Sequence, residues 1–129
     1  LLATRPGARL LLHGRDAEKG ARLLKELQVL AAEDVELSFH VADLSRLGEV
    51  RALADEVSTS VPALDVLVNN AGAGPGQEGA PRQETEDGHE RIFTVNTVAP
   101  YLLAELLKPL LVAGRQPRVV HVASLGQAP

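Results

Sequence analysis

Polar residues at three points of the chain have types and spacing suited to holding a small polar ligand. Asn69-Asn70-Ala71-Gly72 directly follows the apolar run Leu64–Val68, which predicts a buried strand. Gly72 permits close approach of a ligand to the backbone, and ligands of open α/β sheets bind at the carboxyl ends of strands. Asn96 lies in a helical pattern, and Pro100 at i+4 has no N–H to donate to its carbonyl.

Ser124 is the third point, and it follows the strand-like run Arg118–Ala123. Its hydroxyl can donate to a carbonyl oxygen and stabilise negative charge that develops there. The structural alternative is a turn residue for Ser124, and for Asn96 an Asn–Pro irregularity without function. The four histidines lack metal-ligand spacing and are predicted to be structural, and no carboxylate pair stands out as an acid/base couple.

Apolar runs bounded by turn signals alternate with helical patterns, which predicts an α/β fold with a parallel sheet. The predicted strands are Arg9–His13, Val35–Val41, Leu64–Val68 and Arg118–Val122. The predicted helix caps are Asp16, Ser45 and Asp87, the last in a capping-box pattern with Glu90. The second helix is expected to bury Val50, Leu53, Ala54 and Val57. A third helix is predicted from Gly88 to Gly114, after an exposed loop over Ala73–Glu86.

Composition narrows the class of protein. The 129 residues are about one domain, and 13 basic against 17 acidic residues, with no basic run, argue against a nucleic-acid surface. The absence of cysteine excludes disulfides, thiolate metal sites and a cysteine nucleophile. No apolar run is long enough to span a bilayer and no secretory signal is evident, so a cytoplasmic location is the expectation. A chain without methionine that begins at Leu1 indicates processing or a piece of a longer protein.

Asn69-Asn70-Ala71-Gly72 after its strand, with Asn96 and Ser124 at suitable distances behind it, resembles the Asn-Asn-Ala-Gly pattern of the short-chain dehydrogenases/reductases. The resemblance covers essentially all 129 residues, which correspond to the middle of a family domain. It implies an incomplete Rossmann-type doubly wound parallel sheet, with residues 1–129 forming a partial NAD(P)-binding domain of the second to fifth strands and intervening helices. The first strand would lie between the second and fourth. Two strand pairs with unpaired inner edges, and marginal stability, are therefore expected.

The resemblance also implies cofactor contacts. Arg15 follows Gly14, the position where NAD-preferring members carry a carboxylate, and would pair with the 2′-phosphate of NADP; NAD is the less favoured cofactor. Asp43 would accept from the adenine amino group and Leu44 would pack near the ring. The remaining cofactor contacts would be Asn70, Ala71 and Gly72. The alternatives are a solvated arginine in a helix-entry loop and an ordinary helix-start aspartate.

Catalytic roles for Ser124 and Asn96 follow from the same resemblance. Ser124 would polarise the substrate carbonyl, and the backbone carbonyl of Asn96 would hold a water in a proton relay to a lysine. The family's tyrosine and lysine, four residues apart, would lie beyond Pro129, and its glycine-rich phosphate turn would precede Leu1. Tyr101 is not a substitute, because no lysine follows it at i+4.

The expected function of the parent protein is NADP-dependent hydride transfer between an alcohol and a ketone or aldehyde of a small-molecule substrate, with no metal. Thr85–Glu90 and Ser124–Gln127 resemble the retinol-dehydrogenase-like branch, and the helix from Gly88 would serve a homo-oligomer. The 129 residues alone are expected to be inactive. The alternatives are a catalytically inactive truncated fragment or binding module, a ketoreductase piece of a larger synthase, and, more remotely, a flavodoxin-like regulatory domain.

Overall fold

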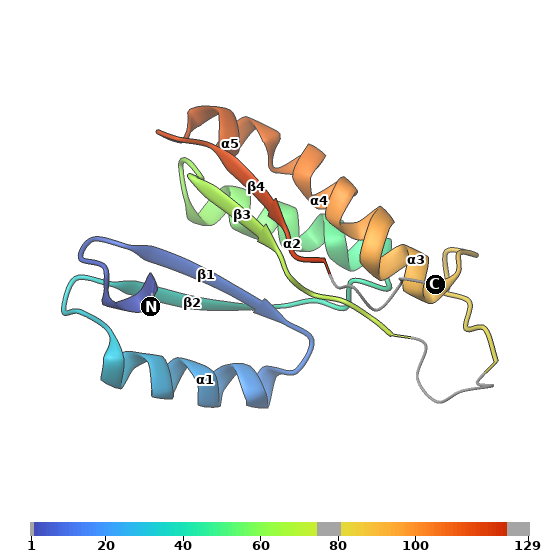
Figure 1. Cartoon of the computed structure of the whole chain (residues 1–129), viewed down its shortest axis with the longest axis horizontal. Coiled ribbons are helices and arrows are strands. Elements are labelled where there is room, and N and C mark those ends of the chain that lie inside the picture. Colours follow the sequence, from blue (N-terminus) through green and yellow to red (C-terminus); the bar gives the residue numbers. More distant parts are fainter. Residues whose placement is uncertain (1, 75–80, 124–129) are drawn as a thin grey trace. The chain divides into compact units, whose positions relative to one another are not determined.

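The computed structural model describes residues 2–74 and 81–123, and it divides into two compact units (Figure 1). Unit 1 comprises Leu1–Asp43 and unit 2 comprises Leu44–Pro129. Strands and helices alternate along the described ranges, which confirms the predicted α/β class. In chain order the elements are a 3-10 turn (Leu2–Thr4), β1 (Arg9–Gly14), α1 (Ala17–Leu30), β2 (Glu36–Val41), α2 (Leu47–Ser60), β3 (Val66–Asn69), α3 (Arg91–Phe93), a π-helical segment (Thr94–Val98), α4 (Ala99–Leu106), α5 (Lys108–Ala113) and β4 (Arg118–His121).

Unit 1 is a strand–helix–strand unit in which β1 and β2 run parallel and α1 connects them. The predicted strands and the helix between them are confirmed. Asp16 caps α1 as predicted, because its Oδ1 accepts from the Lys19 N–H at 3.0 Å. The cap fixes the turn that leads from the end of β1 into the helix.

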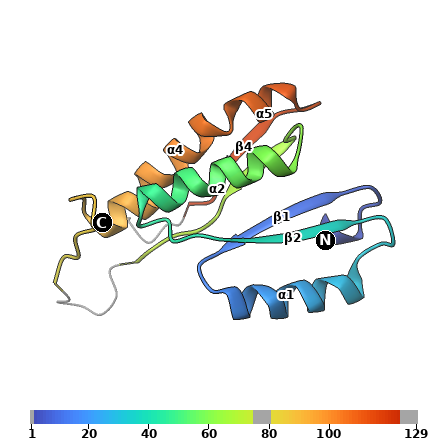
Figure 2. The same cartoon turned by 180° about the vertical axis from the view of Figure 1, so that it is seen from behind.

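Unit 2 contains β3 and β4 in parallel, with Val66 opposite Arg118 and Asn69 opposite His121 at the two ends of the pair. The chain between these strands forms the helices α3 to α5, and α2 precedes β3. In Figure 1, α2 lies behind the β3–β4 pair, and in Figure 2, seen from behind, α2 lies in front of it. One face of the pair is therefore covered by a helix.

Unit 2 buries apolar side chains where α2 packs on α4. The buried residues of α2 are Val50, Leu53, Ala54 and Val57, which confirms the predicted helix face. Those contributed by the later helical segments are Val95, Ala99, Leu103, Leu107 and Leu111. Because removal of apolar surface from water is the dominant favourable term in folding, this core holds the segment that carries Asn96.

The described strands form two separate two-stranded sheets, β1–β2 and β3–β4, which confirms the predicted division into two strand pairs. The predicted third strand needs a correction. It spans Val66–Asn69, not Leu64–Val68, and it is not buried, since Val66 and Val68 are 48% and 49% exposed. Exposed and half-buried residues alternate along β3 because a two-stranded sheet with a helix on one face leaves its other face open.

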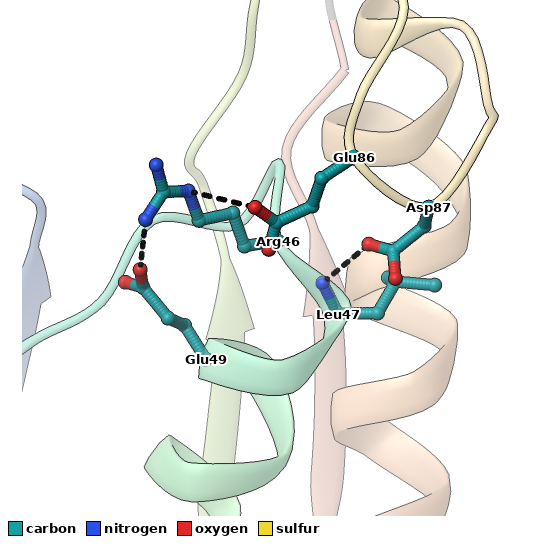
Figure 3. A network of polar contacts seen from close by, with 5 residues as sticks. All are labelled: Arg46, Leu47, Glu49, Glu86 and Asp87. Carbon is teal, nitrogen blue, oxygen red and sulfur yellow. Dashed lines mark hydrogen bonds and ion pairs between the residues drawn. The ribbon is translucent and has the colours of Figure 1, made fainter.

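The predicted cap of α2 is also wrong. Arg46, not Ser45, is the N-cap residue, and its side chain makes no capping hydrogen bond. The Asp87 carboxylate takes that role from the loop before α3, since its Oδ2 accepts from the Leu47 N–H at 3.0 Å (Figure 3). Arg46 reaches the same loop and pairs with Glu86 at 3.8 Å, while also pairing with Glu49 at 3.2 Å.

The third predicted helix begins later than expected and is not continuous, since Leu107 separates α4 from α5. α3 starts at Arg91, and Glu90 is its N-cap. The two carboxylate oxygens of Glu90 accept from the N–H groups of Ile92 at 2.9 Å and Phe93 at 2.7 Å. These two donors hold the pKa of the Glu90 carboxyl below its ordinary value.

Candidate functional site

The predicted site residues fall into two groups, one in each unit. Arg15 and Asp43 belong to unit 1, whereas Leu44, the Asn70–Gly72 segment and Asn96 belong to unit 2. Ser124 lies outside the described residues. Each group therefore has its own local geometry.

A cleft of about 290 Å³ opens in unit 1 at the carboxyl end of β1. The residues that line it come from the β1–α1 turn, the first turns of α1, and β2: Gly14, Arg15, Asp16, Lys19, Gly20, Leu23 and Phe39. This is the strand-end position at which open α/β sheets bind ligands. The structure thus places Arg15, one of the predicted cofactor contacts, in a cleft.

The charges in the cleft leave it positive. Lys19 Nζ lies 3.6 Å from Asp16 Oδ2, and the Lys19 N–H that donates to the same carboxylate holds the pKa of Asp16 below its ordinary value. Arg15 is exposed and forms no ion pair with another residue of the described part of unit 1. Two cations against one carboxylate leave one net positive charge, which favours an anionic ligand.

Three residues of this cleft were missed by sequence reasoning: Lys19, Leu23 and Phe39. Lys19 lies in the first turn of α1, three positions after the cap Asp16, and this i,i+3 spacing of opposite charges at a helix start is a signal available in the sequence. Phe39 stands opposite Leu12 in the parallel pair, and nothing in its local sequence indicates that register. Its ring lies against Gly14 and Gly20, from which it excludes a side chain.

Asp43 follows β2 and is partly buried. The chain just before it is tied to the end of β1. The Ala42 N–H donates to the Gly14 carbonyl at 3.2 Å, and His13 Nε2 lies 3.0 Å from the Ala42 carbonyl oxygen. These contacts fix the backbone that leads to Asp43 at the carboxyl edge of the β1–β2 pair.

The asparagine-rich segment of unit 2 begins inside β3, whose last residue is Asn69. The Asn69 carbonyl accepts from the Val122 N–H at 3.0 Å, and Asn69 Nδ2 lies 3.4 Å from His121 Nδ1. Asn69 thus ties the carboxyl ends of β3 and β4 together through both its backbone and its side chain. Asn70, Ala71 and Gly72 follow as exposed residues.

The Asn96 side chain clamps the backbone directly after this segment. Its Oδ1 accepts from the Ala73 N–H at 2.8 Å, and its Nδ2 donates to the Ala73 carbonyl at 2.9 Å. A Cβ built on Gly72 would lie 3.6 Å from the same Oδ1, an ordinary contact. Two regions far apart in the sequence, both predicted to belong to the site, therefore meet through a two-point hydrogen bond.

Helix geometry is irregular at Asn96, as predicted from Pro100. The segment Thr94–Val98 is π-helical, with the Ala99 N–H donating to the Thr94 carbonyl. Pro100 has no N–H, so it cannot serve the Asn96 carbonyl as the i+4 donor of a regular α-helix. π-Helical turns within helices occur frequently at functional sites. The buried Thr94 hydroxyl anchors the segment by donating to the Glu90 carbonyl at 2.8 Å.

The described part of the chain contains neither a cluster of metal-ligand side chains nor a membrane-spanning helix. Within residues 2–74 and 81–123, no group of three or more His, Asp or Glu side chains is placed to hold a metal ion. Buried His40 contacts the Ser38 hydroxyl at 2.9 Å. None of the described helices is long and apolar enough to cross a membrane.

Comparison with known proteins agrees with this geometry. The family model of the short chain dehydrogenases matches residues 2–128. The chain belongs to the short-chain dehydrogenase family. Members of this family are NAD(P)-dependent oxidoreductases that act on alcohols and ketones. Human retinol dehydrogenase 14 is 38% identical over 132 residues, which cover 93% of this chain and 38% of that protein. The predicted resemblance to the retinol-dehydrogenase-like branch is thereby confirmed.

Two solved short-chain dehydrogenase-type structures show the same fold. A metagenomic short-chain oxidoreductase in complex with NADP has a TM-score of 0.76 at 31% identity, over 95% of this chain and 53% of that one. RhlG of Pseudomonas aeruginosa, in an NADP active-site complex, has a TM-score of 0.70 at 31% identity, over 92% of this chain and 45% of that one. The chain spans only 30% to 47% of the length of eight curated relatives that it matches.

Proposed function

We propose that the protein to which this chain belongs is an NADP-dependent oxidoreductase that interconverts an alcohol and a ketone or aldehyde. The observation that carries the proposal is the positive cleft at the end of β1, lined by Arg15 and Lys19, with glycine at position 14. When bound, the nicotinamide cofactor supplies the hydride chemistry, and the protein binds and orients the reactants.

The choice of NADP over NAD rests on the charge in that cleft. The planar guanidinium of Arg15 can bind a 2′-phosphate through two hydrogen bonds, and Lys19 adds a second cation within the same cleft. A carboxylate beside the adenosine ribose, as NAD-preferring members have, is absent at Gly14. Support also comes from the solved relatives, since the metagenomic oxidoreductase and RhlG were each determined with NADP.

Asn70, Ala71 and Gly72 are proposed to contact the cofactor, and Asn96 is proposed to serve catalysis. The Asn96 side chain is engaged by the clamp on Ala73 through Oδ1 and one Nδ2 hydrogen, and the backbone carbonyl of Asn96, which Pro100 cannot serve as an i+4 donor, is proposed to hold a relay water. The clamp also fixes the backbone next to Gly72, where a cofactor would approach. Asp43 and Leu44 are proposed to contact the adenine. For Ser124, which would polarise the substrate carbonyl, the support is its place after a strand in the sequence.

The test begins with the reading frame that encodes this segment. A glycine-rich turn upstream and a Tyr-x-x-x-Lys pair downstream are expected. The complete encoded protein should then prefer NADPH over NADH by about tenfold or more in kcat/KM, the effect of one charge-assisted phosphate contact. Ser124→Ala should lower kcat by about a hundredfold. Ser58→Ala, an exposed serine of α2, is the matched control and should leave kcat unchanged. Equal use of the two cofactors, or a frame without the Tyr-x-x-x-Lys pair, would contradict the proposal.

A second candidate is that the chain works as a catalytically inactive binding module. The observation that favours it is the pair of two-stranded sheets, whose exposed valines on β3 and β4 offer apolar surface to a partner. Stop and start signals that restrict the frame to Leu1–Pro129 would select this candidate. Flanking carrier or synthase domains would instead indicate a ketoreductase piece of a larger synthase.

A further inference from the structure

The Phe39 ring occupies the space beside two glycines of unit 1. A Cβ built on Gly14 would lie 2.8 Å from Cζ of the ring, and a Cβ built on Gly20 would overlap the same ring. Carbon atoms in contact normally lie about 3.5–4.0 Å apart. Neither position therefore admits a side chain while the ring keeps its place.

The parallel register explains how one ring reaches both glycines. Phe39 pairs with Leu12, and Gly14 lies two residues further along β1, on the same face of the sheet. α1 packs on this strand pair, and Gly20 is a buried residue of that helix. The ring is thus held between the end of β1 and the first turns of α1, at the wall of the cleft.

Backbone conformation does not explain the glycine at position 14. Among the glycines that the structure describes, only Gly7 and Gly88 have the positive φ that excludes most side chains. Gly14 has an ordinary φ, which any L-residue can adopt. Its lack of a side chain is therefore required by the Phe39 ring and not by the chain's path.

We infer that Phe39 is a positioning residue that constrains cofactor specificity, because its ring restricts position 14 to glycine. By keeping position 14 free of a side chain, its ring keeps a carboxylate out of the cleft that Arg15 and Lys19 line. This inference rests on the proposed function, in which that cleft takes the ribose 2′-phosphate of NADP. An aspartate at position 14 would repel the phosphate and accept hydrogen bonds from the ribose hydroxyls of NAD.

The test is a double-mutant cycle on the 129-residue chain, with Gly14→Asp and Phe39→Leu singly and together. Leucine ends at its Cδ atoms, so it lacks the Cζ and Cε atoms that face Gly14. Stability is measured by urea denaturation. Gly14→Asp should lower the equilibrium constant for folding in both backgrounds. The factor by which it falls should be at least about tenfold larger in the wild-type chain than in the Phe39→Leu variant. Equal losses in the two backgrounds would overturn the inference.

The second readout is nucleotide preference, which reports whether the carboxylate that Phe39→Leu admits at position 14 changes the specificity of the cleft. The probes are 2′,5′-ADP and 5′-AMP, followed through the amide signals of Gly14 to Gly20. Wild type and Phe39→Leu should both bind 2′,5′-ADP at least about tenfold more tightly than 5′-AMP. The double variant should lose or reverse that preference. If the double variant folds and keeps the preference for 2′,5′-ADP, the inference fails. If wild type shows no preference while the stability coupling is present, it is the proposed NADP function that fails.

Variants with alanine keep the test decisive if Gly14→Asp does not fold. Gly14→Ala should be strongly coupled to Phe39→Leu in stability. Gly20→Ala should be coupled less, because the ring's Cδ1 also faces Gly20 and leucine retains Cδ atoms. Gly48→Ala, in α2, is the matched control, since no atom lies within 4 Å of a Cβ there, and it should show no coupling to Phe39→Leu. Equal coupling at positions 14 and 48 would contradict the inference.

Discussion

The two units stabilise their candidate site residues in different ways. Unit 2 places Asn96 on a helical segment whose buried side chains, including Val95, Ala99 and Leu103, pack with those of α2. In unit 1, α1 leaves Val29 85% and Leu30 56% exposed, and the apolar residues that reach full burial are Ala3 and Ala42. The geometry of its cleft therefore depends on few contacts, above all the Phe39 ring and the Asp16 cap. A site on a large core tolerates change elsewhere, whereas a site on a small one depends on single residues.

The largest expected difference concerns core substitutions. Leu103→Ala, in α4, should lower the free energy of unfolding of unit 2 by about 3 kcal/mol, because Leu103 is only 8% exposed and a cavity would remain. Leu27→Ala, at a half-buried position of α1, should cost unit 1 about 1 kcal/mol. Urea denaturation followed by separate amide signals of each unit measures both. Equal losses in the free energy of unfolding would show that the two units do not differ in how strongly they depend on a buried core.

The Asn96 clamp should give the next largest effect. Asn96→Asp keeps an acceptor for the Ala73 N–H but removes the donor to the Ala73 carbonyl and sets two oxygens against each other. The loss should be about 1 kcal/mol, seen as roughly fivefold faster hydrogen exchange of the Ala73 amide. Asn70→Asp, in the same exposed segment, is the control and should leave that exchange unchanged. An unchanged Ala73 amide in Asn96→Asp would mean that the core alone positions this loop.

Removal of the loop cap on α2 should have an effect of similar size, and loss of the ion pair beside the cap a smaller one. Asp87→Ala deletes the acceptor for the Leu47 N–H and should destabilise unit 2 by about 1 kcal/mol. Glu86→Gln removes only the exposed pair with Arg46 at 3.8 Å and should cost about 0.3 kcal/mol or less. Comparison of the two thermal unfolding midpoints separates capping from surface charge. Equal effects would mean that Asp87 acts by charge and not as a cap.

The smallest effect should be a pH dependence confined to acid. The pKa of Glu90 is lowered in the folded chain by the N–H groups of Ile92 and Phe93. Its contribution is complete above the ordinary glutamate pKa of about 4.3, and it is lost as the pH falls through the lower folded value. Glu90→Gln should remove this part of the acid-side slope while leaving the stability profile near neutral pH parallel to wild type. A slope that persists unchanged would assign the acid sensitivity to other carboxyls.

Local patterns were enough to predict much of this structure. The spacing of Val50, Leu53, Ala54 and Val57 gives the buried face of α2, since residues three and four apart share one side of a helix. The proline after Asn96 predicts an irregular helix, and the structure has a π-helical segment there. The division into two strand pairs was also predicted, from the strand order that the resemblance implies.

Contacts between distant residues could not be predicted in the same way. Asp87 caps α2 from forty positions away, so the sequence around Ser45 carries no signal of it. The packing of Phe39 against Gly14 depends on the register of two strands, and a shift of one residue would turn the ring to the other face. The sequence predicts which elements form. The contacts of Asp87 and Phe39 depend on how distant segments pack and pair, which local patterns do not encode.

The most direct test of the account is whether the cleft of unit 1 recognises a ribose 2′-phosphate through Arg15. The ¹⁵N-labelled chain is titrated with 2′,5′-ADP and 5′-AMP, as wild type, as Arg15→Ala, and as Arg22→Ala, an exposed arginine of α1 that does not line the cleft. Wild type should bind 2′,5′-ADP at least about tenfold more tightly than 5′-AMP. This preference should be lost in Arg15→Ala and kept in Arg22→Ala. Equal binding of the two nucleotides by wild type, or a preference that survives in Arg15→Ala, would contradict the account.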